Sequence, residues 1–171
     1  RANAHSQVMA QLGLEVGTFA LATCHRAENT DDPQRLGEIM AGLADIAEQM
    51  PVVLPLHPRT RNLLKTHGLE HHLSSIKVVD PLPFLAANVI LTDSGGVQKE
   101  AYFYGVPCIT LRDETEWVET VQMGFNQLVG ASRTAINTAM SNRSVPKGPT
   151  DVYGDGAAAA RIVAILEKSL S

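Results

Sequence analysis

The sequence predicts an α/β fold in which helices cover both faces of a parallel sheet. Short apolar runs rich in β-branched residues alternate with stretches of helical periodicity, and this order is typical of right-handed crossovers around a parallel sheet. The chain has 171 residues, 44% of them hydrophobic, which suits one compact domain with a substantial core. We therefore expect a single domain over residues 1–171.

The expected strands are TFALAT at 18–23, PVVLPL at 51–56, IKVV at 76–79, NVILT at 88–92 and PCITL at 107–111. Helical periodicity covers 33–49, about 59–66, about 97–104, 132–141 and 157–170. The first helix follows Asp31-Asp32-Pro33, which is typical of a helix start, with Asp as the N-cap and Pro at the first helical position. The last helix is strongly amphipathic, so we expect it to dock onto the domain.

Composition argues against several classes of partner. The formal net charge of -4 opposes a surface for nucleic acid, because phosphate backbones are bound mainly by clustered Lys and Arg. No apolar run is long enough to cross a bilayer, and the first residues lack the pattern of a signal peptide, so we expect a cytoplasmic protein. Cys24 and Cys108 lie in apolar segments without metal-ligand spacing, which predicts reduced, buried thiols.

The segment ILTDSGGVQKEA at 90–101 has the order of a phosphate site: a strand, a polar turn with glycines and then a helix. Ser94 can donate a hydroxyl, while Gly95 and Gly96 let the backbone approach a pyrophosphate. Glu100, about one turn into the helix, could reach a ribose diol. The alternative is an ordinary N-cap with a glycine turn, and a solvated Glu100.

Other strands also end in polar residues, and all parallel strands end at the same edge of a sheet. His25 could polarise or protonate a leaving oxygen there and Arg26 could neutralise a phosphate, although such a histidine also satisfies loop carbonyls in many proteins. The remaining candidates at these strand ends are His57, Arg112, Thr115 and Glu116. Metal binding is disfavoured because no element carries a His-x-x-x-His or Cys-x-x-Cys pair. A serine hydrolase would need a Gly-x-Ser-x-Gly elbow, which the sequence around Ser94 lacks.

The chain resembles the non-hydrolysing UDP-N-acetylglucosamine 2-epimerases over nearly its whole length. The resemblance rests on motifs in matching order, namely HRAEN, HPRT, DP, LTDSGGVQKEA, GVP, LRDETEWVE, LVG and YGDG. Members of this family have the two-domain GT-B fold, so the resemblance implies that the chain is the C-terminal, UDP-binding domain. The proton-transfer carboxylates of the family belong to an N-terminal domain, which we expect to be missing here.

The reaction implied by the resemblance inverts carbon 2 of UDP-GlcNAc to give UDP-ManNAc, by eliminating UDP and adding it back on the other face. It implies no cofactor and a place in polysaccharide biosynthesis. Ser94 and Gly95 then match the diphosphate anchors, with Gly96 beside them, and Glu100 matches the acceptor of the ribose hydroxyls. His25 matches the catalytic contribution of this half, with Arg26 beside it. Arg112, Thr115 and Glu116 match a segment that lines the cleft, and His57, in the HPRT motif, is a further candidate to bind the substrate.

Three features depart from the common family pattern. Ala27 replaces a second arginine after the histidine, which argues against a second, regulatory nucleotide. The segment from Pro81 to Thr92 is shorter than expected, which weakens Phe84 as a candidate to lie against uracil. Trp117-Val118 replaces a common Arg-Pro and favours a branch that includes epimerases for UDP-2,3-diacetamido-2,3-dideoxyglucuronate.

Two further readings remain open beside the epimerase. One is half of a GT-B glycosyltransferase, and the other is a module that binds a UDP-sugar without turnover. We expect the isolated chain to bind UDP without metal and to be inactive alone, and the full-length enzyme to be a homodimer.

Overall fold

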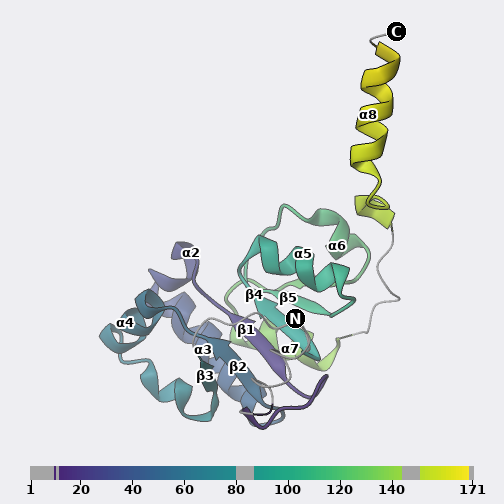
Figure 1. Ribbon diagram of the computed structural model, residues 1–171. Coiled ribbons are helices and arrows are strands. Elements are labelled where there is room, and N and C mark those ends of the chain that lie inside the picture. The colour runs from purple at the N-terminus through teal and green to yellow at the C-terminus, as the bar shows by residue number, and fades with distance from the viewer. Residues whose placement is uncertain (1–9, 11, 80–86, 144–150, 170–171) are drawn as a thin grey trace.

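The computed structural model describes residue 10 and residues 12–79, 87–143 and 151–169 (Figure 1). Its centre is a sheet of six parallel strands in the order β3-β2-β1-β4-β5-β6. The strands are β1 (Ala20–Thr23), β2 (Val52–Pro55), β3 (Lys77–Val79), β4 (Val89–Thr92), β5 (Cys108–Thr110) and β6 (Asn126–Leu128). The predicted parallel sheet is confirmed. The edge strand β6 was not among the expected strands, because its three residues, Asn-Gln-Leu, have no apolar pattern.

The expected helices form with bounds that differ from the prediction by at most two residues. They are α3 (Pro33–Ala47), α4 (Pro58–Thr66), α5 (Gly95–Phe103), α7 (Arg133–Ser141) and α8 (Ala158–Ser169). Short elements that the periodicity did not indicate are α2 (Ala27–Thr30), α6 (Val118–Gln122), and the 3-10 helices η1 (Glu70–Ser75) and η2 (Asp151–Tyr153). Elements of three to six residues are too short to produce a recognisable apolar stripe.

Helices cover both faces of the sheet, as expected. Alternate strand residues point to opposite faces, so Ala20 and Leu54 join a core with α3 and α7, while Leu21 and Ile90 join a second core with α5. The central strands β1 and β4 are buried on both faces of the sheet, which explains why their sequences are continuous apolar runs.

Helix α3 begins where the sequence predicted. The Asp32 side chain accepts hydrogen bonds from the backbone N–H groups of Gln34 and Arg35, and Pro33 occupies the first helical position. Helix α3 packs closely on α7 through Gly42, where an added Cβ would lie 3.1 Å from two side-chain atoms of Ile136. This close approach fixes the layer on one face of the sheet.

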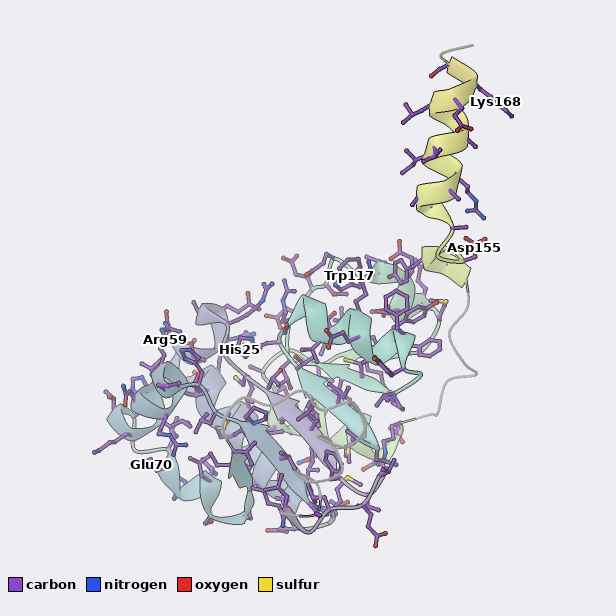
Figure 2. All side chains as sticks on the ribbon, viewed as in Figure 1. His25, Arg59, Glu70, Trp117, Asp155 and Lys168 are labelled. Atoms are coloured by element: carbon purple, nitrogen blue, oxygen red, sulfur yellow. The ribbon has the colours of Figure 1, made fainter. Side chains whose placement is uncertain are left out.

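The expected docking of the last helix is wrong. Helix α8 stands clear of the domain, with Lys168 near its far end (Figures 1 and 2). None of its residues is buried, and its apolar side chains Ile162, Val163, Ile165 and Leu166 are each more than half exposed. The amphipathic pattern identifies an apolar face but not its partner, and the faces of the sheet are already covered by α3, α5 and α7.

The order of the strands reverses between β1 and β4, which are neighbours although β2 and β3 lie between them in the chain. This is the order of a Rossmann fold, in which ligands bind beyond the carboxyl ends of the strands at that reversal. The loops that follow β1 and β4 carry His25 and Ser94, so the topology brings the two main candidate motifs together.

Candidate functional site

The carboxyl ends of β1 and β4 are joined by side chains as well as by the sheet. Thr23 pairs with Thr92 in register, and their hydroxyl oxygens lie 2.6 Å apart. The Thr92 hydroxyl also accepts a hydrogen bond of 2.9 Å from the backbone N–H of Ser94. These hydrogen bonds therefore fix the point at which each of the two candidate loops leaves the sheet.

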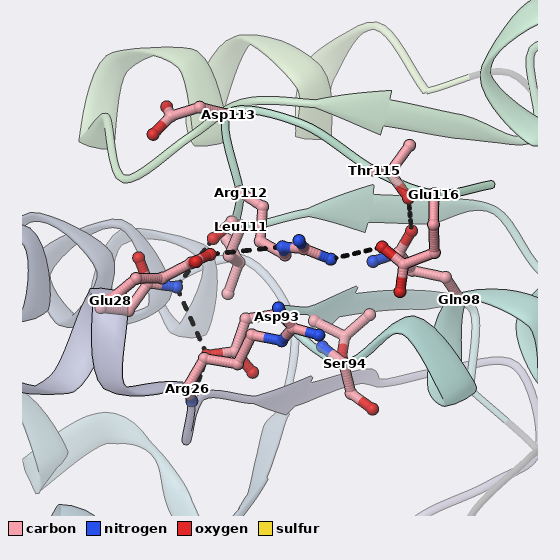
Figure 3. A network of polar contacts seen from close by, with 12 residues as sticks. Arg26, Glu28, Asp93, Ser94, Gln98, Leu111, Arg112, Asp113, Thr115 and Glu116 are labelled. Carbon is pink, nitrogen blue, oxygen red and sulfur yellow. Dashed lines mark hydrogen bonds and ion pairs between the residues drawn. The ribbon is translucent and has the colours of Figure 1, made fainter. Parts of the chain in front are cut away.

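Asp93 ties the loop after β1 to the loop after β4 (Figure 3). Its side chain is fully buried, and its Oδ2 accepts hydrogen bonds from the backbone N–H groups of His25 at 3.0 Å and Arg26 at 2.9 Å. Asn29 Nδ2 donates to the same oxygen at 3.3 Å. The backbone on which His25 and Arg26 stand is thus held by one carboxylate.

Asn29 extends this network to the next strand. It is fully buried, and its Nδ2 also donates to the carbonyl oxygen of Leu111 at 2.8 Å, directly after β5. Its Oδ1 accepts from Arg35 Nε at 3.2 Å, and Arg35 pairs with Asp113 at 3.1 Å. Three strand ends are therefore cross-linked by buried polar groups.

Arg112 lies between two carboxylates on the same edge (Figure 3). Its side chain is 8% exposed, and it donates to Glu28 at 3.2 Å and to Glu116 at 2.8 Å. Burial alone would lower the pKa of Arg112, but its bond to Glu116 and the charges of Glu116 and Glu28 raise it. A backbone hydrogen bond and Arg112 hold the pKa of Glu116 below its usual value. The guanidinium stays charged and bridges two loops.

The N-terminus of α5 faces this cluster. Ser94 is the N-cap residue in an extended backbone conformation, and its hydroxyl makes no capping hydrogen bond. A Cβ on Gly95 would collide with the Glu116 carboxylate and lie 3.2 Å from Trp117 Nε1. A Cβ on Gly96 would meet only the Ser94 hydroxyl at 3.8 Å, so Gly96 leaves the approach to the helix open. The two glycines form the first helical turn and not a separate loop.

Gln98 anchors the segment after β5 over α5. It is buried, and its Oε1 accepts hydrogen bonds from the Thr115 hydroxyl at 2.6 Å and from Asn126 Nδ2 at 3.2 Å. The Thr115 hydroxyl in turn accepts from the backbone N–H of Trp117 at 3.1 Å. In this structure Thr115 shapes the loop that carries Glu116.

Trp117, one of the departures in the sequence, packs beside α5. Lys99 Nζ lies 4.3 Å from the centre of its ring and 4.9 Å from that of Tyr153. The rings of Trp117 and Tyr153 meet edge to face, with centroids 5.9 Å apart. Trp117 therefore joins the helix with the candidate phosphate site to the segment that precedes α8.

Two candidate residues, His57 and Glu100, lie outside this cluster. His57 caps α4, where its Nδ1 accepts a 3.2 Å hydrogen bond from the backbone N–H of Arg59, and Arg59 forms an ion pair with Asp31. Glu100 is exposed on α5, which suits both a ligand contact and a solvated side chain. Phe84 lies outside the described residues.

The described residues contain no group of three or more His, Cys, Asp or Glu that could hold a metal ion. No helix in the described part of the chain is long and apolar enough to cross a membrane. Cys24 and Cys108 are free and buried, as expected. Burial raises the pKa of the Cys108 thiol to about 12.

Comparison with known proteins decides the family. The sequence matches the family model described as UDP-N-acetylglucosamine 2-epimerase over residues 1–167. The chain belongs to the UDP-N-acetylglucosamine 2-epimerase family. It is 48% identical over 161 residues to a UDP-2,3-diacetamido-2,3-dideoxy-D-glucuronate 2-epimerase of Pseudomonas aeruginosa, with 88% of this chain and 44% of that protein covered.

Solved structures of 2-epimerases share the fold. The Methanocaldococcus jannaschii UDP-GlcNAc 2-epimerase, solved in complex with UDP-GlcNAc and UDP, superposes with a TM-score of 0.79 at 39% identity, covering 98% of this chain and 50% of that one. The Neisseria meningitidis UDP-GlcNAc 2-epimerase bound to UDP-GlcNAc gives 0.74 at 27% identity, covering 97% and 49%. The predicted fold, a Rossmann-like domain that corresponds to one half of a GT-B fold, is confirmed, and this member of the epimerase family spans about half the length of these relatives.

Sequence reasoning missed the polar residues that hold the epimerase-family motifs in place, namely Asp93, Asn29 and Gln98. Each stands inside or beside a motif that was recognised, but nothing in their spacing distinguishes a buried support from an exposed contact. Their burial depends on which strands become neighbours.

Proposed function

We propose that this chain is the UDP-binding half of a non-hydrolysing UDP-sugar 2-epimerase acting on UDP-GlcNAc. Carbon 2 would be inverted by elimination and re-addition of UDP. A base removes the proton from carbon 2, the bond from carbon 1 to the diphosphate oxygen breaks with its electron pair leaving on UDP, and a double bond forms between the two carbons. The diphosphate oxygen of UDP then bonds again to carbon 1, and a proton adds to the opposite face of carbon 2, which completes the inversion.

One observation carries the proposal. The open N-terminus of α5, at Ser94 and Gly96, lies beside the His25–Arg26 loop at the point where the strand order reverses. A helix N-terminus offers free N–H groups and a positive partial charge, which suits a diphosphate. The M. jannaschii relative with the same fold was solved with UDP-GlcNAc and UDP, which supports a nucleotide sugar as the ligand here.

The chemistry of each candidate residue suggests its role. Ser94 and the backbone at Gly95 and Gly96 would hold the diphosphate, while Glu100 would accept the ribose hydroxyls. His25 and Arg26 would act on the departing diphosphate. Arg112, Thr115 and Glu116 would line the cleft and His57 would bind the substrate, while Phe84 stays a candidate to lie against uracil.

The test is calorimetry of UDP with the 171-residue chain in the presence of a chelator. We expect binding without metal and no epimerisation, because we place the proton-transfer carboxylates in a second domain. Gly96→Val should abolish binding while the fold is retained, since the position is open in this structure and a branched side chain would fill the approach to the helix.

Two results would contradict this proposal. Binding that disappears with the chelator would mean that a metal ion is required. Binding that survives both Gly96→Val and Ser94→Ala would place the nucleotide elsewhere on the chain.

A second substrate is favoured by the 48% identity to the P. aeruginosa UDP-2,3-diacetamido-2,3-dideoxy-D-glucuronate 2-epimerase. The full-length protein should be assayed with both UDP-sugars, following inversion at carbon 2 and deuterium uptake from heavy water. A higher kcat/KM for the diacetamido sugar would assign the chain to that branch.

We also propose that residues 1–171 act as one UDP-binding domain together with an N-terminal domain. This is supported by the relatives, which are about twice as long. We expect the full-length enzyme to be a cytoplasmic homodimer. Light scattering of the full-length protein measures the oligomeric state.

A further inference from the structure

The two carboxylate oxygens of Asp93 have different surroundings. Oδ2 accepts three hydrogen bonds, from His25, Arg26 and Asn29. Oδ1 is buried and has no hydrogen-bond partner among the described residues. Because leaving a buried carboxylate oxygen unpaired costs free energy, an arrangement in which Oδ1 gains a donor is favoured.

Two groups stand close enough to become that donor. The imidazole Nδ1 of His25 lies 3.9 Å from Oδ1, which is beyond hydrogen-bond distance. The Cys24 thiol is the other neighbour, and burial, followed by the charge of Asp93, raises its pKa well above its usual value. Cys24 thus remains a neutral thiol, which is a weak donor. The imidazole is the stronger of the two.

The side chains of Asp93 and His25 differ in how firmly the surrounding structure holds them. The Asp93 side chain is 0% exposed and is held by three hydrogen bonds to Oδ2, whereas the His25 side chain is 47% exposed. An ordinary hydrogen bond requires Nδ1 to come about 1 Å nearer, and the exposed ring is the side chain that has room to move.

We propose that Asp93 is the positioning residue for His25: its Oδ1 accepts the Nδ1–H, so that Nε2 is the nitrogen that takes up a proton and donates it to the departing diphosphate oxygen. The inference rests on the proposed function, in which His25 meets the UDP-sugar. Asp93 thereby has two tasks, because Oδ2 holds the backbone of the loop and Oδ1 selects one tautomer of the ring. A neutral histidine without such a partner exchanges between two tautomers, and only one of them has a free lone pair on Nε2.

The isosteric variant Asp93→Asn provides the test. The oxygen of its amide is expected to keep the two backbone N–H groups, which places the NH₂ group next to His25. An NH₂ group cannot accept from Nδ1–H, so the ring should switch to the tautomer protonated on Nε2. We would read this from the nitrogen-15 chemical shifts of the imidazole at alkaline pH. His25→Gln identifies the resonances, since the chain has six histidines.

Asp113→Asn is the matched control, because Asp113 also follows a strand at this edge but is exposed and pairs with Arg35. It should leave the tautomer of His25 unchanged. In the full-length enzyme, Asp93→Asn should lower kcat by roughly 10²–10⁴-fold, the usual contribution of a positioned acid–base group, with a small change in KM.

An Nε2–H tautomer in the wild-type chain overturns the inference, and this measurement does not require the variant to fold. The same tautomer in wild type and in a folded Asp93→Asn chain overturns it too. If the tautomer switches as expected but the chain fails to bind UDP, the positioning role stands and the proposed function fails.

Discussion

At the scale of single residues, the site contains buried side chains that fix the backbone of the loops and exposed side chains that can contact a ligand. Asp93 and Asn29 are fully buried and fix the backbone of neighbouring loops. His25 is half exposed, and Glu100 is exposed on the helix that begins at Gly95. Buried polar groups need every partner they have, whereas exposed ones can exchange water for ligand at small cost.

Glu100→Gln tests whether the exposed carboxylate binds ribose. The loss of a charge-assisted hydrogen bond should weaken UDP by about 1.5–3 kcal/mol, and it should weaken 2'-deoxy-UDP less because that ligand lacks one hydroxyl. Calorimetry with both ligands measures the difference. Glu70→Gln, which removes an equal charge on η1, is the control and should change neither affinity. If Glu100→Gln weakens the binding of both ligands equally, Glu100 is a solvated surface residue that does not contact the ribose.

At the scale of an element, two glycines of α3 differ in the space that surrounds them. Gly42 lies against α7, with Ile136 atoms 3.1 Å from an added Cβ, whereas a Cβ on Gly37 would meet Leu69 at an ordinary 3.5 Å. Alanine favours a helix over glycine by about 1 kcal/mol, but overpacking a core costs about 1–3 kcal/mol.

Gly37→Ala should therefore raise the free energy of unfolding by up to about 1 kcal/mol. Gly42→Ala should lower it by up to about 2 kcal/mol, because the clash with Ile136 exceeds the gain in helix propensity. Urea unfolding of both variants measures the two changes against the same wild type. Stabilisation by Gly42→Ala would mean that α3 and α7 can move slightly apart without lowering the free energy of unfolding.

At the scale of the whole chain, the described residues form a packed domain and a helix that stands clear of it (Figure 1). Removing residues 158–171 should change the free energy of unfolding by less than about 0.5 kcal/mol, since α8 has no buried residue in the described structure. It should also reduce concentration-dependent association, because the exposed apolar side chains of α8 are removed.

Tyr153→Ala is the comparison for this truncation. Tyr153 packs edge to face on Tyr102 and donates a hydrogen bond of 3.2 Å to Glu119, so its loss should destabilise the domain measurably. Thermal unfolding and sedimentation of both proteins are the measurements. A large loss of stability on removing α8 would contradict the exposed position of this helix.

Sequence patterns predicted the architecture because strands and helices follow local periodicity, and the polar strand ends predicted the edge of the site. They could not indicate that Asp93 is a support while Ser94 beside it is open, since this depends on β1 lying next to β4. The exposed position of α8 could not be predicted for a similar reason, because an apolar stripe does not specify whether or by what it is covered.

The side-chain network after β1, β4 and β5 also has a consequence for the order in which the protein folds. The hydrogen bonds that join the loop after β1 to the loops after β4 and β5 connect residues between 64 and 84 positions apart, from Asn29–Asp93 to Glu28–Arg112. Closing such long loops costs chain entropy before any contact compensates for it, so these contacts form late. No peptide carrying a single motif can reproduce the candidate site. Nucleotide affinity would thus report that the chain has finished folding, which helix content measured alone cannot do.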